Sequence, residues 1–129
     1  MIESIIASPE VVHYICKRFD IKMSKKLGQN FLIKRGIVDE IVKAADLQEG
    51  EPVEIGPGIG TLTQGLAQSG ANVTAIELDT RLLEVLDTTL AQYSNVTIVH
   101  GDVLKLDVPS IMHHEPFKVV ANLPYYITT

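Results

Sequence analysis

Residues 53–60 constrain the fold of this chain more than any other stretch. A short apolar run ends in Glu54 and Ile55, glycines follow at positions 56, 58 and 60, and residues 61–68 then have a helical pattern. Glycine is used where a backbone must adopt a positive φ or let another group approach closely, and the N–H groups of such a turn can cradle a ligand. The stretch therefore predicts a strand, a tight turn and the start of a helix, with a ligand site at the turn.

Strand and helix patterns alternate after this turn. We expect strands at residues 73–77, 96–99 and 117–121, and a helix between the first two of them that Thr80 caps. Alternation of this kind predicts right-handed βαβ units and a parallel sheet, which makes this an α/β protein.

Two helical segments precede the turn, with a basic stretch between them. Ser8 and Pro9 indicate the start of the first helix, and the pattern of residues 36–45 predicts the second. Residues 22–35 show neither period, and we interpret them as an arm rich in basic residues. The apolar stripe of the first helix consists of Val11, Val12, Ile15, Cys16 and Phe19. Cys16 is the only cysteine, so no internal disulfide can form, and we expect it in the core.

Charge is unevenly distributed along the chain. The formal net charge is −5, which by itself argues against a nucleic-acid partner. Residues 1–45, however, hold eight of the 11 Lys and Arg residues against five acids, a net charge of +3. The front section could therefore contact phosphates, or it could be an ordinary solvated surface. His113 and His114 have no matching ligands at a useful spacing, so no metal site is predicted.

Carboxylates follow two of the expected strands. Ligands of a parallel sheet collect at the carboxyl ends of its strands, and this rule brings the glycine turn, Glu77, Asp102 and Asn122 around one crevice. Glu77 lies 21 residues after Gly56, where a carboxylate can accept hydrogen bonds from two ribose hydroxyls. Asp102 can accept from an exocyclic amine or a ring N–H. Each acid is also a plausible helix cap, but their joint placement favours a nucleoside site.

Two enzyme classes share such a site: dinucleotide oxidoreductases and S-adenosylmethionine methyltransferases. The glycine spacing is G-x-G-x-G rather than G-x-G-x-x-G. Asn-Leu-Pro-Tyr at residues 122–125 resembles the Asn/Asp-Pro-Pro-Tyr motif of methyltransferases that act on the amino group of adenine or cytosine. There, the Asn oxygen and a nearby backbone carbonyl accept hydrogen bonds from the base amine, and an aromatic ring stacks on the extruded base.

The chain as a whole resembles the bacterial small-subunit ribosomal RNA adenine dimethyltransferases. The resemblance rests on residues 27–32, 54–60, 76–79, 101–104 and 122–128. It implies a Rossmann-like methyltransferase fold with helices on both faces, strand order 3-2-1-4, and dimethylation of two adjacent adenines in 16S rRNA of an immature small subunit, with S-adenosylmethionine as methyl donor. The implied cofactor contacts are Gln29, Asn30 and Leu32 from the arm, Gly56 at the methionine part, Gly58, Glu77 at the ribose, Asp102 at the adenine, and Asn122. The implied catalytic set is Asn122, Leu123 and Tyr125, with Tyr125 as the stacking ring.

Members of that family continue beyond the Asn-Leu-Pro-Tyr motif, so we expect residues 1–35 to form a helix and arm, and residues 36–129 an incomplete methyltransferase domain that stops after the fourth strand. The unpaired edge of residues 117–121 is then expected to cause self-association, with Lys118 blunting it slightly. Two alternatives remain open: a 23S rRNA methyltransferase of the erythromycin-resistance type, and a module that binds cofactor or RNA without turnover.

Location and further partners follow from composition. No apolar run is long enough to span a membrane, and residues 1–3 lack the basic start of a signal peptide, so we expect a cytoplasmic protein with no membrane or DNA partner.

Overall fold

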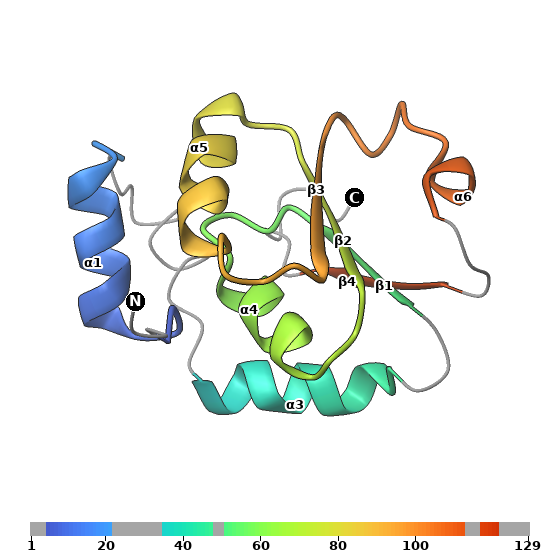
Figure 1. Cartoon of the computed structure of the whole chain (residues 1–129), viewed down its shortest axis with the longest axis horizontal. Coiled ribbons are helices and arrows are strands. Elements are labelled where there is room, and N and C mark those ends of the chain that lie inside the picture. Colours follow the sequence, from blue (N-terminus) through green and yellow to red (C-terminus); the bar gives the residue numbers. More distant parts are fainter. Residues whose placement is uncertain (1–4, 22–34, 48–50, 113–116, 122–129) are drawn as a thin grey trace.

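The described part of the chain is built around one parallel sheet. The computed structural model describes residues 5–21, 35–47, 51–112 and 117–121. Its elements are α1 (Pro9–Arg18), α3 (Arg35–Ala45), β1 (Glu51–Ile55), α4 (Thr61–Gln68), β2 (Val73–Glu77), α5 (Thr80–Thr89), β3 (Val96–His100), α6 (Val108–Ile111) and β4 (Phe117–Ala121). All pairings are parallel and the strand order is β3-β2-β1-β4 (Figure 1). The expected strands and their order are confirmed.

Helices lie on both faces of the sheet, as expected for a Rossmann-like fold. On one face, Val73 and Val120 pack against α3 and α4, and Val96 also reaches the cluster that α1 and α5 form. The cluster on the other face consists of Val53, Ile76 and Met112, with Val99, Val103, Leu106 and Val108 packed against it. In Figure 1, α4 and α5 lie to the left of the sheet and α6 to its right.

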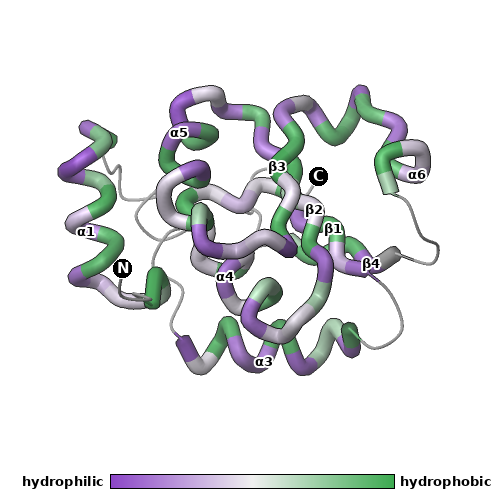
Figure 2. Tube along the Cα trace, in the orientation of Figure 1, coloured by the Kyte–Doolittle hydropathy of each residue, from purple (hydrophilic) through white to green (hydrophobic). Residues whose placement is uncertain are grey.

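The first helix belongs to the hydrophobic core. Val12, Ile15 and Cys16 of α1 are buried in one cluster with Ile59 of the glycine turn and Leu86 of α5. Figure 2 shows hydrophobic and hydrophilic residues alternating around α1 and α3, which is the pattern of helices with one buried stripe. The expected core position of Cys16 is confirmed, and burial raises the pKa of its thiol. The division of the chain at residue 35 stays a prediction.

The first strand begins earlier than the sequence predicts. The apolar run that predicts this strand begins at Val53, whereas β1 begins at Glu51 and includes Pro52. Pro52 pairs in register with Lys118 of β4, but the pairing of β1 with β2 begins only at Val53. Proline has no N–H to donate and is tolerated where a strand has a neighbour on one side only, which explains how β1 extends past it.

The caps of two helices differ from their predicted form. Asp79, not Thr80, is the N-cap of α5, and its carboxylate accepts a hydrogen bond from the N–H of Arg81 at 2.9 Å. Thr80 is the first residue of the helix, and the N-cap position is the one before it. The Asp79 carboxylate therefore caps the helix, and the Thr80 hydroxyl does not. Ser8 is the N-cap residue of α1, but its hydroxyl donates to the Glu10 carboxylate at 2.7 Å and does not cap the helix.

Lys118 connects β4 to the end of α3. Its ammonium donates to the carbonyl oxygens of Ala45 at 2.6 Å and Asp46 at 2.8 Å, where a helix leaves carbonyls without partners. These hydrogen bonds hold the end of α3 against β4, while the expected effect of this charge on the strand edge stays a prediction. The next residue, Val119, is 59% exposed. No helix in the described ranges is long and apolar enough to cross a membrane.

Helices α3 and α4 approach each other at a glycine. A Cβ added to Gly65 of α4 would overlap Cγ1 of Val38 and lie 3.4 Å from Cγ2 of Val42, both on α3. Gly36, in the first turn of α3, is the opposite case, because a Cβ there would meet nothing within 4 Å. The two glycines form a matched pair for testing this packing.

We predict that Gly65→Ala lowers the free energy of unfolding by about 1–3 kcal/mol, because Val38 must leave its position in a packed core. Gly36→Ala should leave stability unchanged or raise it by about 0.5 kcal/mol, since alanine restricts the unfolded chain. Urea unfolding of both variants is the measurement. A stabilising effect of Gly65→Ala equal to that of Gly36→Ala would contradict the close approach of the helices.

Candidate functional site

The glycine turn connects the end of β1 to the start of α4. Gly56, Gly58 and Gly60 have φ values of 68°, 63° and 98°, which side chains with a Cβ rarely adopt. The N–H of Gly56 donates to the carbonyl of Ile76 at 3.0 Å, and the N–H of Gly60 donates to Pro57 at 2.9 Å. The predicted strand, turn and helix start are confirmed, and Gly56 is exposed at the surface of the turn.

The turn is held from behind by α5. The Thr89 hydroxyl donates to the carbonyl of Ile59 at 2.9 Å, and Ile59 itself is 1% exposed. A Cβ on Gly60 would lie 3.1 Å from the Thr89 hydroxyl and 3.2 Å from a methyl group of Leu90. The turn therefore has a fixed shape set by a hydrogen bond and by packing, which suits a backbone that must present N–H groups to a ligand.

Glu77 lies beside this turn, at the carboxyl end of β2. Its side chain is 6% exposed; one oxygen accepts from the N–H of Gly58 at 3.2 Å and the other from the N–H of Asp79 at 2.9 Å. Burial raises the pKa of the Glu77 carboxyl, and these backbone N–H groups oppose the rise by stabilising the anion. A carboxylate can accept about four hydrogen bonds, so two backbone donors leave acceptor capacity for a ligand.

Asp102 follows the end of β3 by two residues and is half-buried. Its carboxylate accepts from the N–H of Leu104 at 2.9 Å, but residues 103–105 form a turn and the next helix begins at Val108, so Asp102 does not cap a helix. The neighbouring Gly101 donates its N–H to the main-chain carbonyl of Glu77 at 3.0 Å. This hydrogen bond connects the ends of β2 and β3, and Asp102 is the next residue in the chain.

Glu54 was given no role by the sequence pattern. Its side chain is 1% exposed and accepts a hydrogen bond from the hydroxyl of Thr63, in the first turn of α4. Burial, with a smaller contribution from the charge of Glu77, raises the pKa of Glu54 to about 8, although the Thr63 hydroxyl lowers it. The available signal was an acid placed inside the apolar run that precedes the glycines.

The remaining candidates lie outside the described residues: Gln29, Asn30 and Leu32 of the arm, and Asn122, Leu123 and Tyr125 after β4. The register of β4 gives their chain context. Ala121, its last residue, pairs with Ile55, the last residue of β1. The chain therefore leaves β4 at the same edge of the sheet at which the glycine turn begins.

Comparison with known proteins identifies the family. The sequence profile of the family described as ribosomal RNA adenine dimethylase matches residues 20–129. The chain belongs to the ribosomal RNA adenine dimethylase family. Its curated relatives include proteins named ribosomal RNA small subunit methyltransferase A from Listeria monocytogenes serotype 4a (strain HCC23), 48% identical over 131 residues, and from Alkaliphilus metalliredigens (strain QYMF), 47% identical over 129 residues. Each alignment covers 96% of this chain and 44% or 45% of the relative, so the chain spans less than half the length of these proteins.

Solved structures agree with the assignment to the ribosomal RNA adenine dimethylase family. The 23S rRNA methyltransferase ErmE is similar with a TM-score of 0.62 and 35% identity, over 74% of this chain and 38% of that one. A dimethyladenosine transferase from Plasmodium falciparum has a TM-score of 0.55 and 30% identity, over 74% of this chain and 34% of that one. The methyltransferase CcbJ from Streptomyces caelestis, 21% identical, shares the fold over 94% of this chain with a TM-score of 0.57.

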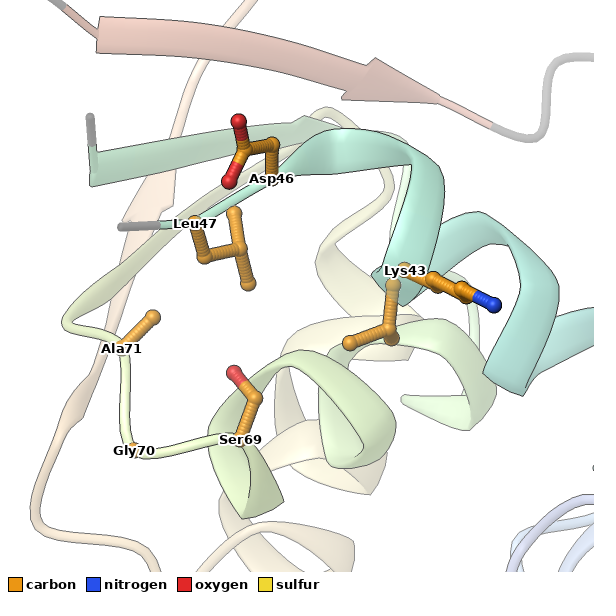
Figure 3. A pocket seen from close by; sticks show the side chains of 7 residues that line it. Lys43, Asp46, Leu47, Ser69, Gly70 and Ala71 are labelled. Carbon is orange, nitrogen blue, oxygen red and sulfur yellow. The ribbon is translucent and has the colours of Figure 1, made fainter. Parts of the chain in front are cut away.

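A separate hollow lies away from the candidate site in this dimethylase family member. It has a volume of about 470 Å³ and is lined by Val42, Lys43, Asp46, Leu47, Ser69, Gly70 and Ala71. Figure 3 shows these residues at the C-terminal ends of α3 and α4 and in the segments that follow. The segments lead into the starts of β1 and β2, opposite the edge that carries Gly58 and Glu77. Within the described ranges, no three His, Cys, Asp or Glu side chains gather as metal ligands do.

Proposed function

We propose that this chain carries the cofactor-binding part of an S-adenosylmethionine-dependent rRNA adenine dimethyltransferase, which dimethylates two adjacent adenines of 16S rRNA in an immature small ribosomal subunit. The observation that carries the proposal is the carboxylate of Glu77 beside the N–H of Gly58, at the carboxyl edge of a parallel sheet, in a member of this family. Such a partner implies a cytoplasmic location.

The residues at this edge suit the cofactor. Gly56 is exposed with a φ of 68°, so the backbone there is open to a ligand, and Glu77 keeps acceptor capacity for ribose hydroxyls. Asp102 would accept from the adenine, and Gln29, Asn30 and Leu32 would complete the site from the arm. When bound, S-adenosylmethionine supplies a methyl group on a positively charged sulfur.

The residues after β4 would position the substrate. Asn122 and a nearby backbone carbonyl, for which Leu123 is the candidate, would accept hydrogen bonds from the amine of the target adenine, and Tyr125 would stack on the base. These contacts would aim the nitrogen lone pair at the methyl group. Catalysis by this chain's residues is then mainly positioning and electrostatic stabilisation.

Two other functions are supported by specific observations. The similarity to ErmE favours, as a second candidate, the methylation of adenine in 23S rRNA. The coverage of only 44% of the length of a curated relative favours, for these 129 residues taken alone, cofactor or RNA binding without turnover. The 23S rRNA methyltransferase differs from the proposed function in its RNA substrate, and the binding module differs in that it transfers no methyl group.

We predict that Glu77→Ala weakens the binding of S-adenosylmethionine by about 1–3 kcal/mol, because the ribose loses hydrogen bonds to a charged acceptor. Isothermal titration calorimetry at pH 7 measures this loss. Glu84→Ala, which removes an exposed carboxylate from α5, is the matched control and should bind like the unmodified chain. Equal affinities for Glu77→Ala and the control would refute the assignment of Glu77.

Asn122→Ala should reduce methyl transfer far more than RNA binding, because the proposed contact acts at the transition state. Single-turnover assays with labelled S-adenosylmethionine should compare this chain with a longer relative, on immature small subunits and on 23S rRNA. Transfer to the small subunit by the longer protein supports the proposal, and transfer to 23S rRNA alone supports the second candidate. A parallel fall of RNA affinity and transfer in Asn122→Ala would make Asn122 a binding residue.

We also predict that the 129-residue chain, when prepared alone, self-associates through β4. In the described residues β4 pairs only with β1, and its Val119 is 59% exposed. Analytical ultracentrifugation over a range of concentrations tests this. A monomer at high concentration, with slow hydrogen exchange at Val119 and Val120, would show that the strand edge is covered.

A further inference from the structure

A buried carboxyl group lies beneath the glycine turn and takes no part in the function proposed above. The Glu54 side chain is 1% exposed, and its partner in the described residues is the hydroxyl of Thr63. Glu54 pairs in register with Ala75 of β2 and Val120 of β4, which do not titrate. On the same face, α3 and α4 contribute apolar side chains such as Val38 and Leu62.

The charged group that acts on Glu54 is a second carboxyl, Glu77, and Asp79 acts in turn on Glu77. Glu54 and Glu77 lie on one face of the sheet, because strand residues two apart share a face and Glu54 pairs with Ala75. Arg81, the basic residue nearest to Glu77 in sequence, forms an ion pair with Asp79 at 2.8 Å. Neither of the two ion pairs among the described residues, Arg35–Asp39 and Arg81–Asp79, involves Glu54.

When two carboxyl groups interact away from solvent, ionising both is costly because their charges repel each other, so one of them keeps a proton. The hydrogen bonds decide which one. Glu77 accepts from two backbone N–H groups, which stabilise its anion, whereas Glu54 accepts from a single hydroxyl and is the more deeply buried of the two. Burial and the charge of Glu77 accordingly raise the pKa of Glu54 to about 8.

We propose that Glu54 is a positioning residue that keeps a proton beneath the glycine turn, and that loss of this proton weakens cofactor binding. The inference rests on the cofactor proposed for this site. The neutral acid holds the first turn of α4 through Thr63 and leaves Glu77 as the single negative charge below Gly58. Once ionised, Glu54 repels the Glu77 carboxylate. This repulsion weakens the hydrogen bond from the Gly58 N–H to Glu77 and moves the carboxylate from the position in which it accepts hydrogen bonds from the ribose hydroxyls.

The free energy of unfolding of the chain without cofactor should also depend on the protonation of Glu54. Unfolded Glu54 ionises near its ordinary value of 4.5, while in the folded chain it keeps its proton up to about 8. The folded state therefore binds more protons between these values, so the contribution of this group to the free energy of unfolding decreases as pH rises from 4.5 to 8. Below 4.5 the group is protonated in both states and contributes no pH dependence.

The binding experiment compares the unmodified chain with Glu54→Gln, which has nearly the same shape and cannot ionise. The probe is S-adenosylhomocysteine, which lacks the sulfonium charge and so does not respond to the added negative charge as a cation would. We take the ratio of the dissociation constant of the unmodified chain to that of Glu54→Gln. Titration of the ligand's own amino group affects both constants equally and cancels in this ratio. We expect the ratio to be near one at pH 6.5 and about tenfold at pH 9, where about a tenth of Glu54 keeps its proton.

Two further measurements guard against a variant that fails to fold. Thr63→Val removes the hydroxyl that lowers the pKa of Glu54, so the loss of affinity should begin at a higher pH than in the unmodified chain. Carbon-13 NMR of glutamate-labelled, unmodified chain should show one side-chain carboxyl that titrates near pH 8.

Three results would overturn the proposal: a ratio that stays constant with pH, an unmoved midpoint in Thr63→Val, or titration of every glutamate near 4.5. A chain that binds no cofactor at any pH would instead overturn the proposed function and the link to it. In that case the NMR titration would still decide whether Glu54 holds a proton.

Discussion

Three strand ends meet at one residue, Glu77. Its carboxylate accepts the N–H of Gly58, which follows β1, and the N–H of Asp79, which follows β2. Its main-chain carbonyl accepts the N–H of Gly101, which follows β3. Parallel strands bring these loops to one edge of the sheet, and these hydrogen bonds link the loops to one another. The shape of the candidate site depends on these three bonds.

Three buried polar side chains lie near the same edge of the sheet. Glu54, Thr63 and Glu77 are all nearly inaccessible to solvent, although the clusters around them are apolar. A buried polar group without a partner costs about 1–3 kcal/mol, and each of these three makes a hydrogen bond in the structure. The cost of burial is thus offset by bonds that also hold the glycine turn rigid, which is what a preorganised binding site requires.

The parts of the structure that local pattern determines could be predicted from the sequence. The alternation of strands and helices and the glycine turn follow from residue periodicity, while the strand order β3-β2-β1-β4 followed from the family resemblance. The extension of β1 through Pro52 could not be read in this way, because it depends on which neighbour pairs with each side of the strand. The short helix α6 has only four residues, too few to show a helical period.

Long-range contacts account for the rest. Thr80 and Asp79 are both acceptable caps by residue type, and only the geometry of the loop after Glu77 selects Asp79. Lys118 gave no sign that it would reach the end of α3, which lies 73 residues earlier in the chain. Glu54 was overlooked as a functional residue because its importance comes from the nearness of Glu77, a residue on another strand.

In the function proposed here, the glycine turn and the end of β2 form the cofactor site. Backbone amide NMR of the 129-residue chain, titrated with S-adenosylmethionine, tests it most directly. We expect the largest shifts at Gly56, Gly58 and the residues after Glu77. Shifts confined to the hollow between the ends of α3 and α4, near Leu47 and Gly70, would contradict it.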